Sequence, residues 1–400
     1  MIDIAKSTSS KYLLFGGLYF IQGIILAIGQ LIIPVYLVEK GLPVPLITLV
    51  AGIILIPWSI KFFWGAFIDY YIRFGRKIFV IIGGFQFAAG LFAAACIDPG
   101  ELLVLFVIFL LISVSGVVLL DVATDAWAIE TCVETERGKI SGSMFAGQHA
   151  GRASGFIFLA FLAHAVSYGF SFAVAAIIVL LVTGYVFFFQ ETRVAVPSEK
   201  MGASLLHEFK KKTTQYVSVF SLIVLISSGI LTLAIPLYVK IVFHLDITQM
   251  GLMFALFPIA TAVGSLTGGG MADRYGRKLV LFLFISLSVV FSALLIFASS
   301  WEILVVLYGI ITFLYGGYQT TIFAMFMDVT NPRLGGVQFS ILTGIGNTGS
   351  TIGETVSGSL VSLLGFDRVF LYAAWFLGPV LLMVYFLRLN AGKKEESMVS

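Results

Sequence analysis

The sequence predicts an all-α membrane protein with twelve transmembrane helices in two related six-helix halves, and with both termini in the cytoplasm. Three observations predict this fold: the composition, the recurrence of long apolar runs, and a motif that occurs twice. Of the 400 residues, 59% are hydrophobic and only 11% are charged, whereas soluble domains contain about 25% charged residues. Such a chain cannot cover a water-soluble fold, so soluble classes of protein are excluded.

Apolar runs long enough to cross the membrane recur along the whole chain. A helix needs about 20 residues to cross about 30 Å of hydrocarbon. In lipid these runs must be helices, because each backbone donor and acceptor has to be satisfied within its own segment. The predicted spans are residues 12–38, 46–68, 78–97, 102–129, 140–166, 169–190, 216–243, 250–271, 279–300, 303–327, 339–364 and 368–389.

Basic residues indicate which side of the membrane holds the termini. An even number of spans places both termini on one side, and Lys and Arg in short loops mark the cytoplasm. Most of the 24 Lys and Arg fall on the side of the termini, and Lys40, Lys240 and Arg368 fall on the other side. The net charge of +3 follows from this bias, so it indicates no nucleic-acid partner.

Neither the cysteines nor the N-terminus predicts further processing. Cys96 and Cys132 are predicted near opposite membrane faces, so no disulfide is implied. The first apolar run is too long for the hydrophobic region of a signal peptide. We therefore expect it to remain as a spanning helix.

The longest non-apolar segment falls in the middle of the chain. Residues 191–215 are polar and include Lys210, Lys211 and Lys212. We predict that they form a cytoplasmic linker between an N-terminal six-helix half, residues 1–190, and a C-terminal six-helix half, residues 216–400.

Internal repeats support this division. Fixed-offset similarity between segments is the signature of a duplicated architecture. Four features recur about 200 residues apart: Gly65-Ala-Phe-Ile-Asp69 with Phe74-Gly75-Arg76-Lys77, as Gly269 to Lys278; Ile33-Pro34-Val35-Tyr36, as Ile235-Pro236-Leu237-Tyr238; Gly151 and Gly155, as Gly349 and Gly353; and Glu130, as Asp328.

The repeated loops carry paired charges at the predicted cytoplasmic face. A carboxylate beside clustered Arg and Lys can accept charge-assisted hydrogen bonds. Such bonds would hold the cytoplasmic side shut, and the alternative is that these charges only fix the topology. The predicted cytoplasmic gate consists of Asp69, Arg76, Glu130, Asp273, Arg277 and Asp328.

The loop after the eighth span resembles the signature of the major facilitator superfamily. The segment Gly269 to Lys278 matches Gly-x-x-x-Asp-Arg-x-Gly-Arg-Lys completely. The first copy departs by a three-residue insertion and by Tyr70 where a basic residue is usual. The resemblance covers the whole chain and implies a transporter that works by alternating access, with its substrate site between the halves near the membrane midplane.

Few ionisable residues lie inside the predicted spans, and three of them are acids. Each charge at a helix centre costs about 2.5–3.5 kcal/mol on insertion scales, so such residues are candidates for function. Asp121 and Asp125 are four residues apart and share a helix face. Two such carboxylates cannot both ionise cheaply, so one is expected to bind a proton near neutral pH. Glu354 lies on a polar face, and we add it as a third proton-coupling candidate. The alternatives are a neutralised pair and a merely hydrogen-bonded Glu354.

The basic residues in the predicted spans suggest an anionic substrate. His149 and Arg152 are three residues apart, and Arg152 falls about 20 Å from the cytoplasmic end, near mid-membrane. Lys61 falls about 12 Å from that end. Arg can bind a carboxylate or phosphate with two donors, so Lys61 and Arg152 would suit an anion. The alternative is an internally neutralised network without a ligand.

Several segments resemble one branch of the superfamily, which holds muropeptide permeases and acetyl-coenzyme A transporters. The resemblance implies a carrier of bulky solutes, driven by protons in the permease type. By position it gives candidate site roles to Lys61, Asp121, Asp125 and Gln148. The segments that carry it are Ser59 to Asp69, Asp121 to Trp127, Glu136-Arg137-Gly138 and Gly147-Gln148-His149-Ala150-Gly151.

Together these observations predict a secondary transporter rather than an enzyme. We expect it to be proton-coupled and to move a bulky polar or anionic metabolite, either muropeptide-like or similar to coenzyme A and nucleotides. The alternative is a membrane enzyme that uses Asp121 and Asp125 to bind Mg²⁺ and a diphosphate, as prenyltransferases do. Such enzymes need a second acid-rich motif, which the second half lacks, and no P-loop for ATP is present. A receptor without transport would bind a ligand but produce no flux.

The expected partners are a small-molecule substrate, protons and the lipid bilayer. We expect no cofactor and no metal site. The predicted protein is a monomer that crosses the inner membrane of a prokaryote several times.

Overall fold

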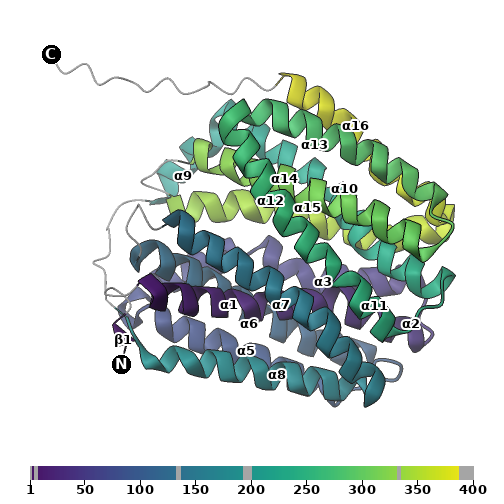
Figure 1. The fold of residues 1–400 in the computed structure, drawn as a ribbon. Coiled ribbons are helices and arrows are strands. Elements are labelled where there is room, and N and C mark those ends of the chain that lie inside the picture. The colour runs from purple at the N-terminus through teal and green to yellow at the C-terminus, as the bar shows by residue number, and fades with distance from the viewer. Residues whose placement is uncertain (1, 4–7, 132–136, 192–200, 331–334, 387–400) are drawn as a thin grey trace.

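The computed structural model describes residues 2–3, 8–131, 137–191, 201–330 and 335–386, and it is a bundle of long helices (Figure 1). The α-helices are α1 Thr8–Ala27, α2 Ile33–Glu39, α3 Val44–Ser59, α4 Phe62–Tyr70, α5 Arg76–Ala95, α6 Leu103–Thr131, α7 Arg137–Ala165, α8 Tyr168–Tyr185, α9 Met201–Lys210, α10 Lys212–Val242, α11 Ile247–Phe254, α12 Leu256–Tyr275, α13 Arg277–Leu294, α14 Trp301–Val329, α15 Gly335–Leu364 and α16 Phe366–Phe386. A π-helix, η2, covers Ile28–Ile32, and 3₁₀ turns cover Ile72–Phe74, Val186–Phe188 and Leu295–Phe297. The two short strands, β1 Ile2–Asp3 and β2 Phe189–Gln190, pair in parallel.

The all-α membrane fold predicted from the sequence is confirmed. In the described part of the chain, ten helical segments are long and apolar enough to cross a membrane. The predicted spans 140–166 and 339–364 are helices α7 and α15, which are not among those ten. Both are rich in Gly and Ser, which lower their hydropathy but allow other helices to approach closely.

Some predicted spans are interrupted inside the bundle. The first contains the π-helix η2 between α1 and α2, and the second breaks at Ile60 and Lys61 between α3 and α4. Helix α3 also contains Pro57, which removes a backbone hydrogen bond and weakens the helix near this break. The predicted linker, 191–215, contains α9 and the start of α10; its residues 192–200 lie outside the described part.

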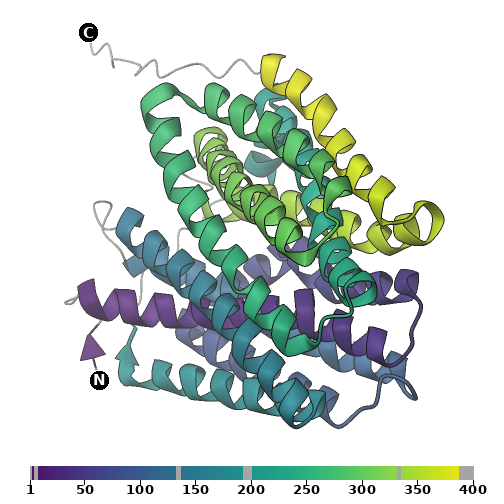
Figure 2. The ribbon, with the colours of Figure 1, turned by 45° about the vertical axis from the view of Figure 1, so that its right-hand side comes forward.

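The first and last described helices indicate one end of the bundle. The start of α1 and helix α9 lie at the left in Figure 1, α16 runs from the right to its end at the top, and α2 and α11 lie at the right. We call the left end the terminal end, which is the predicted cytoplasmic side, and the right end the distal end. Helices α1 to α8, the N-terminal group, gather in one part of the molecule, and α10 to α16, the C-terminal group, gather in another (Figure 1, Figure 2).

Glycines bring helices into direct backbone contact at matching places in the two groups. A Cβ atom added at Gly151 of α7 would lie 2.1 Å from the carbonyl oxygen of Phe20 in α1. One added at Gly353 of α15 would lie 2.1 Å from that of Ile226 in α10. Small residues permit this close packing in membranes, and the contacts explain why Gly recurs at these positions.

The repeated loops have the same backbone geometry. Gly75 has φ 85° and ψ 167°, and Gly276 has φ 87° and ψ 148°. This region is essentially restricted to glycine. Each glycine directly precedes a new helix, α5 or α13, whose first residue is an arginine. The sequence repeat is therefore also a structural repeat.

Candidate functional site

A buried polar network surrounds Asp121 in the middle of the N-terminal group. Lys61 Nζ lies 3.6 Å from Asp121 Oδ2, and Gln22 Nε2 donates to Asp121 Oδ1 at 2.7 Å. Gln148 Nε2 in turn donates to Gln22 Oε1 at 3.0 Å. The break between α3 and α4 places Lys61 here, and α1, α6 and α7 supply the others. Lys61 and Asp121 are only 7% and 3% exposed, so this ion pair is shielded from water.

The second acid of α6 has a different partner. The Tyr19 hydroxyl of α1 donates a hydrogen bond to Asp125 Oδ1. Asp121 and Asp125 therefore both face α1, as their spacing predicts. One carboxylate is compensated by a lysine, whereas the other interacts with a neutral phenol.

Arg152 lies apart from this network, at the boundary between the two groups. It lines a small cavity of about 20 Å³ together with Gln30, Phe156, Thr232, Phe254, Phe257, Tyr308 and Thr312. Arg152 Nε and Gln30 Oε1 are enclosed and have no hydrogen-bond partner. In the described part of the chain, no hydrogen bond or ion pair links Arg152 to Lys61 or Asp121, so a shared anion site of Lys61 and Arg152 stays a prediction.

Glu354 lies across the group boundary from Arg152. It is 4% exposed and accepts a hydrogen bond from the Ser350 hydroxyl at 3.3 Å. It is close enough to Arg152 to interact electrostatically, as are Tyr308 and Tyr315. In the described part of the chain, no carboxylate lies within ion-pair distance of Arg152. The other predicted base, His149, has an enclosed Nδ1 without a partner.

Sequence reasoning did not single out several polar residues of these two sites. Tyr19, Gln22 and Gln30 lie within the first apolar run, and Tyr308 lies within the tenth. They carry no charge, so the cost of burying a charge did not mark them. The signal that could have found them is the amide groups of Gln22 and Gln30 inside a strongly apolar span, since buried amides need partners.

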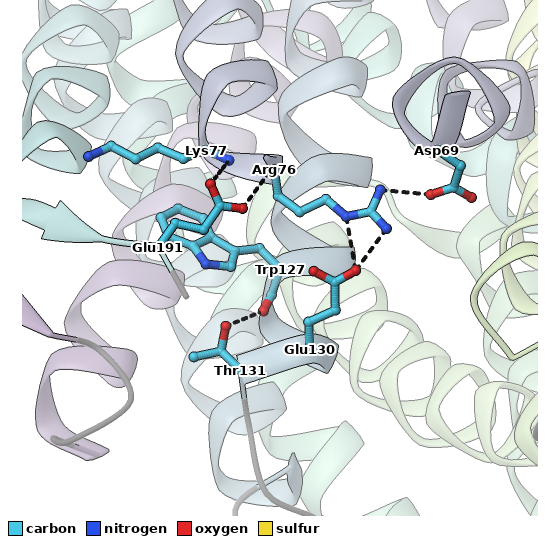
Figure 3. Close-up of polar contacts among 7 residues, drawn as sticks. All are labelled: Asp69, Arg76, Lys77, Trp127, Glu130, Thr131 and Glu191. Carbon is cyan, nitrogen blue, oxygen red and sulfur yellow. Dashed lines mark hydrogen bonds and ion pairs between the residues drawn. The ribbon is translucent and has the colours of Figure 1, made fainter. Parts of the chain in front are cut away.

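Predicted ion pairs at the terminal end are present in both copies, and Figure 3 shows those of the first copy. Arg76 Nη1 lies 2.7 Å from Asp69 Oδ1, and Arg76 Nε and Nη2 donate to Glu130 Oε1 at 3.1 and 2.8 Å. In the second copy Arg277 contacts Asp328. The corresponding acid, Asp273, interacts with Arg277 electrostatically. Arg277 Nη1 also donates to the carbonyl oxygen of Ala324 at 2.8 Å.

Each of these charge clusters connects helices of a single group. The first joins α4, α5 and α6, and the second joins α13 and α14. The contacts therefore brace the terminal end of each group in this conformation. A role for the six residues in closing the cytoplasmic side stays a prediction.

Glu191 completes the first cluster and was not predicted. Its carboxylate accepts hydrogen bonds from the backbone N–H groups of Arg76 and Lys77, at 2.5 and 3.2 Å (Figure 3). These N–H groups lie at the start of α5 and have no acceptor within the helix. A negative charge is favoured at this end of a helix. Lys77 Nζ donates to the carbonyl oxygen of Phe189 at 2.6 Å. Glu191 and Lys77 thus fasten the segment after α8 to the repeated loop.

Polar contacts join the two groups from mid-bundle to the distal end. The Thr48 hydroxyl accepts from the backbone N–H of Gly358 at 3.1 Å and donates to the carbonyl oxygen of Thr355 at 3.2 Å. Nearer the middle, Asn347 Nδ2 donates to the carbonyl oxygen of Trp58 at 3.3 Å. These bonds run along the seam between α3 and α15, which must part if the distal side opens.

An ion pair closes the distal end beside this seam. Lys240 Nζ lies 2.6 Å from Glu39 Oε1, and the Tyr168 hydroxyl donates to Glu39 Oε2 at 2.8 Å. The adjacent Lys40 donates a hydrogen bond to Asp98, and the backbone N–H of Gly100 donates a second one. These two hydrogen bonds hold the pKa of Asp98 below its usual value. We call the contact between Glu39 and Lys240 the distal ion pair.

Removing the distal ion pair should favour opening of the distal side. We expect Glu39→Gln to raise the labelling rate of a Thr355→Cys reporter by about two- to fivefold, since an exposed pair contributes about 0.2–1 kcal/mol. The measurement is labelling by a membrane-impermeant thiol reagent after Cys96 and Cys132 are replaced by Ser. Glu302→Gln is the matched control, because Glu302 is an exposed acid at the start of α14. An equal rate in both variants would contradict a closing role for the pair.

The chain is similar to known membrane transporters. The sequence model of the Major Facilitator Superfamily matches residues 13–221 and 217–399. A hexuronate transporter of Bacillus subtilis (strain 168) is 30% identical over 140 residues, which are 35% of this chain and 31% of that protein. The match thus spans about a third of the relative's length.

Solved structures show the same fold. The nucleoside transporter NupG has a TM-score of 0.75 at 15% identity, covering 94% of this chain and 98% of that one. A point mutant of NupG gives 0.73 at 14% identity, covering 94% and 99%. The sequence match covers nearly the whole chain and agrees with the repeated loops and the helical bundle, so this protein is a member of the major facilitator superfamily.

Proposed function

We propose that this transporter moves an anionic polar metabolite together with a proton by alternating access. The observation that carries the proposal is Arg152. It lies at the boundary of the two groups with an enclosed Nε that has no acceptor, and no carboxylate of the described chain pairs with it. An enclosed donor of a charged group that has no acceptor is unfavourable, so an anion that enters from water completes the site.

Two acids inside the spans support coupling to protons. Asp125 accepts a hydrogen bond from a neutral tyrosine, and Glu354 accepts one from a serine hydroxyl; in the described part of the chain neither lies within ion-pair distance of a cation. A carboxylate removed from water without an ion-pair partner favours its neutral form. Such groups can bind a proton on one side of the membrane and release it on the other. Asp121, which is paired with Lys61, would hold α6 and the helix break in place.

The class of the substrate is part of the proposal. The resemblance to muropeptide and acetyl-coenzyme A carriers favours a bulky solute, whereas the relatives above are named for hexuronates and nucleosides. Hexuronates and coenzyme A esters are anions, which suits Arg152. We further propose that the protein is a monomer in the inner membrane of a prokaryote, with Gln148 and His149 lining the path near Arg152.

The enzymatic alternative receives less support from the geometry. A Mg²⁺–diphosphate site needs carboxylate oxygens that are free to bind the metal. Asp121 is instead occupied by Lys61 and Gln22, and Asp125 by Tyr19. The described residues contain no group of three or more potential metal ligands.

Transport by purified protein in sealed vesicles tests the proposal. We expect an imposed pH gradient to drive accumulation of at least one anion among glucuronate, acetyl-coenzyme A, a muropeptide and uridine monophosphate. A protonophore should reduce the accumulation to the level of equilibration, and protein-free vesicles are the control. Accumulation that is insensitive to the protonophore would contradict proton coupling.

A further inference from the structure

The first span departs from regular helix at the group boundary. Residues Ile28–Ile32 form a π-helix, in which the N–H of Ile33 bonds to the carbonyl oxygen of Ile28. Single π-turns are rare and occur frequently at functional sites. This turn contains Gln30, whose side chain lines the cavity beside Arg152.

Two residues that line the cavity, Arg152 and Gln30, carry polar atoms without partners. Arg152 Nε is an enclosed donor without an acceptor, and Gln30 Oε1 is an enclosed acceptor without a donor. Buried polar atoms in proteins nearly always have partners. An unpartnered donor and an unpartnered acceptor in two residues beside one cavity therefore indicate a ligand that bonds to both. Thr232 and Thr312 add hydroxyl groups from the C-terminal group.

Aromatic rings enclose these polar groups. Phe156 and Phe254 lie 6.0 Å apart, Phe254 and Phe257 5.1 Å, and Phe257 and Tyr308 4.7 Å, measured between ring centroids. The Arg152 guanidinium lies 5.8 Å from the centre of the Phe156 ring, which fixes its position by a cation–π contact. The rings come from both groups, so the cavity forms only when the groups are together.

These features define the chemistry of the ligand. Arg152 requires an anionic oxygen, the Gln30 carbonyl oxygen requires a hydroxyl or N–H donor, and the rings favour an apolar face of carbon and hydrogen. The ligand meets one guanidinium, which also interacts with Glu354. This single positive charge can compensate one negative charge of a ligand better than two. A carboxylate therefore fits better than a doubly charged phosphate.

We infer that the cavity binds a hydroxylated monocarboxylic acid of monosaccharide size, with its carboxylate on Arg152 and a hydroxyl on Gln30. This inference rests on the proposed function and names the substrate class of its site. The present space of about 20 Å³ holds roughly one water molecule, so the two groups must separate slightly around the ligand. A small cargo requires less separation than a coenzyme A ester or a muropeptide.

Equilibrium binding to the full-length protein in detergent tests the inference with three matched probes. Glucuronate has both the carboxylate and the hydroxyls, glucose lacks the carboxylate, and cyclohexanecarboxylate lacks the hydroxyls. We expect glucuronate to bind at least about tenfold more tightly than either. It should also bind more tightly than glucose 6-phosphate. No binding of glucuronate, or tighter binding of any other probe, would overturn the inference.

Variants of the two anchors separate their roles. Arg152→Gln should weaken the binding of glucuronate by about tenfold or more and leave the binding of glucose unchanged. Gln30→Leu should weaken the binding of glucuronate by about threefold or more and leave the binding of cyclohexanecarboxylate unchanged. Gln30→Glu keeps the size of the side chain but should repel the carboxylate, so it tests the same contact if Gln30→Leu folds poorly. Gln86→Leu, which alters a glutamine of α5 outside the cavity, is the control. Equal weakening of all probes in the Gln30 variants would contradict a direct contact.

The binding test and the transport test can fail separately. Binding in detergent needs neither a membrane nor a proton gradient. A protein that binds glucuronate but accumulates none of the four anions would contradict the proposed transport. A protein that accumulates a different anion with protons, yet does not bind glucuronate, would overturn only the inference drawn from the cavity.

Discussion

Replacing Asp125 by Asn should abolish proton-driven accumulation of the substrate while its exchange across the membrane continues. Asparagine cannot bind and release a proton, but its carbonyl oxygen can still accept the hydrogen bond from Tyr19. A gradient of one pH unit provides about 1.4 kcal/mol per proton, which supports about tenfold accumulation of a cargo that moves with one proton. We expect this ratio to fall to about one in the variant.

Two vesicle assays measure the two activities of the Asp125 variant. Uptake against a concentration gradient reports coupling, and exchange of labelled for unlabelled substrate reports the alternating movement alone. Asp98→Asn is the control, because Asp98 is an exposed acid at the distal end that pairs with Lys40. If the Asp125 variant retained uphill uptake, the proton would have to be carried elsewhere, and Glu354 would be the next residue to replace.

Replacing Lys61 by Gln should strongly destabilise the protein. The change leaves the carboxylate of Asp121, which is 3% exposed, without its cation. Breaking a buried pair in this way typically costs about 3–5 kcal/mol. We expect a clear decrease in the temperature of thermal unfolding in detergent.

A second substitution distinguishes the ion pair from general damage. Asp121→Asn in the Lys61→Gln background removes the unpaired charge, and its amide oxygen can still accept from Gln22 Nε2. The double variant should therefore recover much of the lost stability. Lys40→Gln is the matched control, since Lys40 pairs with Asp98 while their side chains are 32% and 42% exposed, and exposed pairs contribute about 1 kcal/mol or less. A double variant as unstable as Lys61→Gln alone would show that Lys61 does not stabilise the protein through its pair with Asp121.

The long helices could be predicted because a membrane imposes a simple rule on the chain. Apolar runs of sufficient length must be helical, and the runs in this sequence are separated by short polar turns. The interruptions at Ile28–Ile32 and at Ile60 could not be predicted in this way. A π-turn and a helix break leave the composition of a span unchanged, and their positions depend on the neighbouring helices. Helix α9 was not predicted because its apolar face, formed by Leu205 and Phe209, is short, and polar and charged residues dominate the segment.

The candidate site could be predicted in part, for a related reason. Charges in lipid are costly, so Lys61, Asp121, Asp125, Arg152 and Glu354 are visible in the sequence. Their partners could not be assigned, because spacing along one helix does not show which side chains of other helices approach it. Lys61 and Arg152 were both expected to suit an anion; in the structure Lys61 pairs with Asp121, and Arg152 lines the cavity at the boundary between the groups.

The resemblance to a narrower branch of carriers is not confirmed by the comparisons. The similar proteins are named for hexuronates and nucleosides, and the cargo that we propose for the cavity between the groups is small. The segments that carry the resemblance, such as Ser59 to Asp69 and Asp121 to Trp127, surround the ion pair of Lys61 and Asp121. The similarity of these segments therefore indicates a shared way of stabilising the N-terminal group more directly than a shared solute.

The most direct test of the central claim is the proton movement that the substrate itself drives. Vesicles containing the purified protein are prepared with equal pH inside and outside, and a concentration gradient of the transported anion is then imposed. If one proton enters with each anion, the interior should become more acidic until the gradient is dissipated, and Asp125→Asn should remove this signal. Entry of the anion with no change in internal pH would contradict proton-coupled transport by this protein.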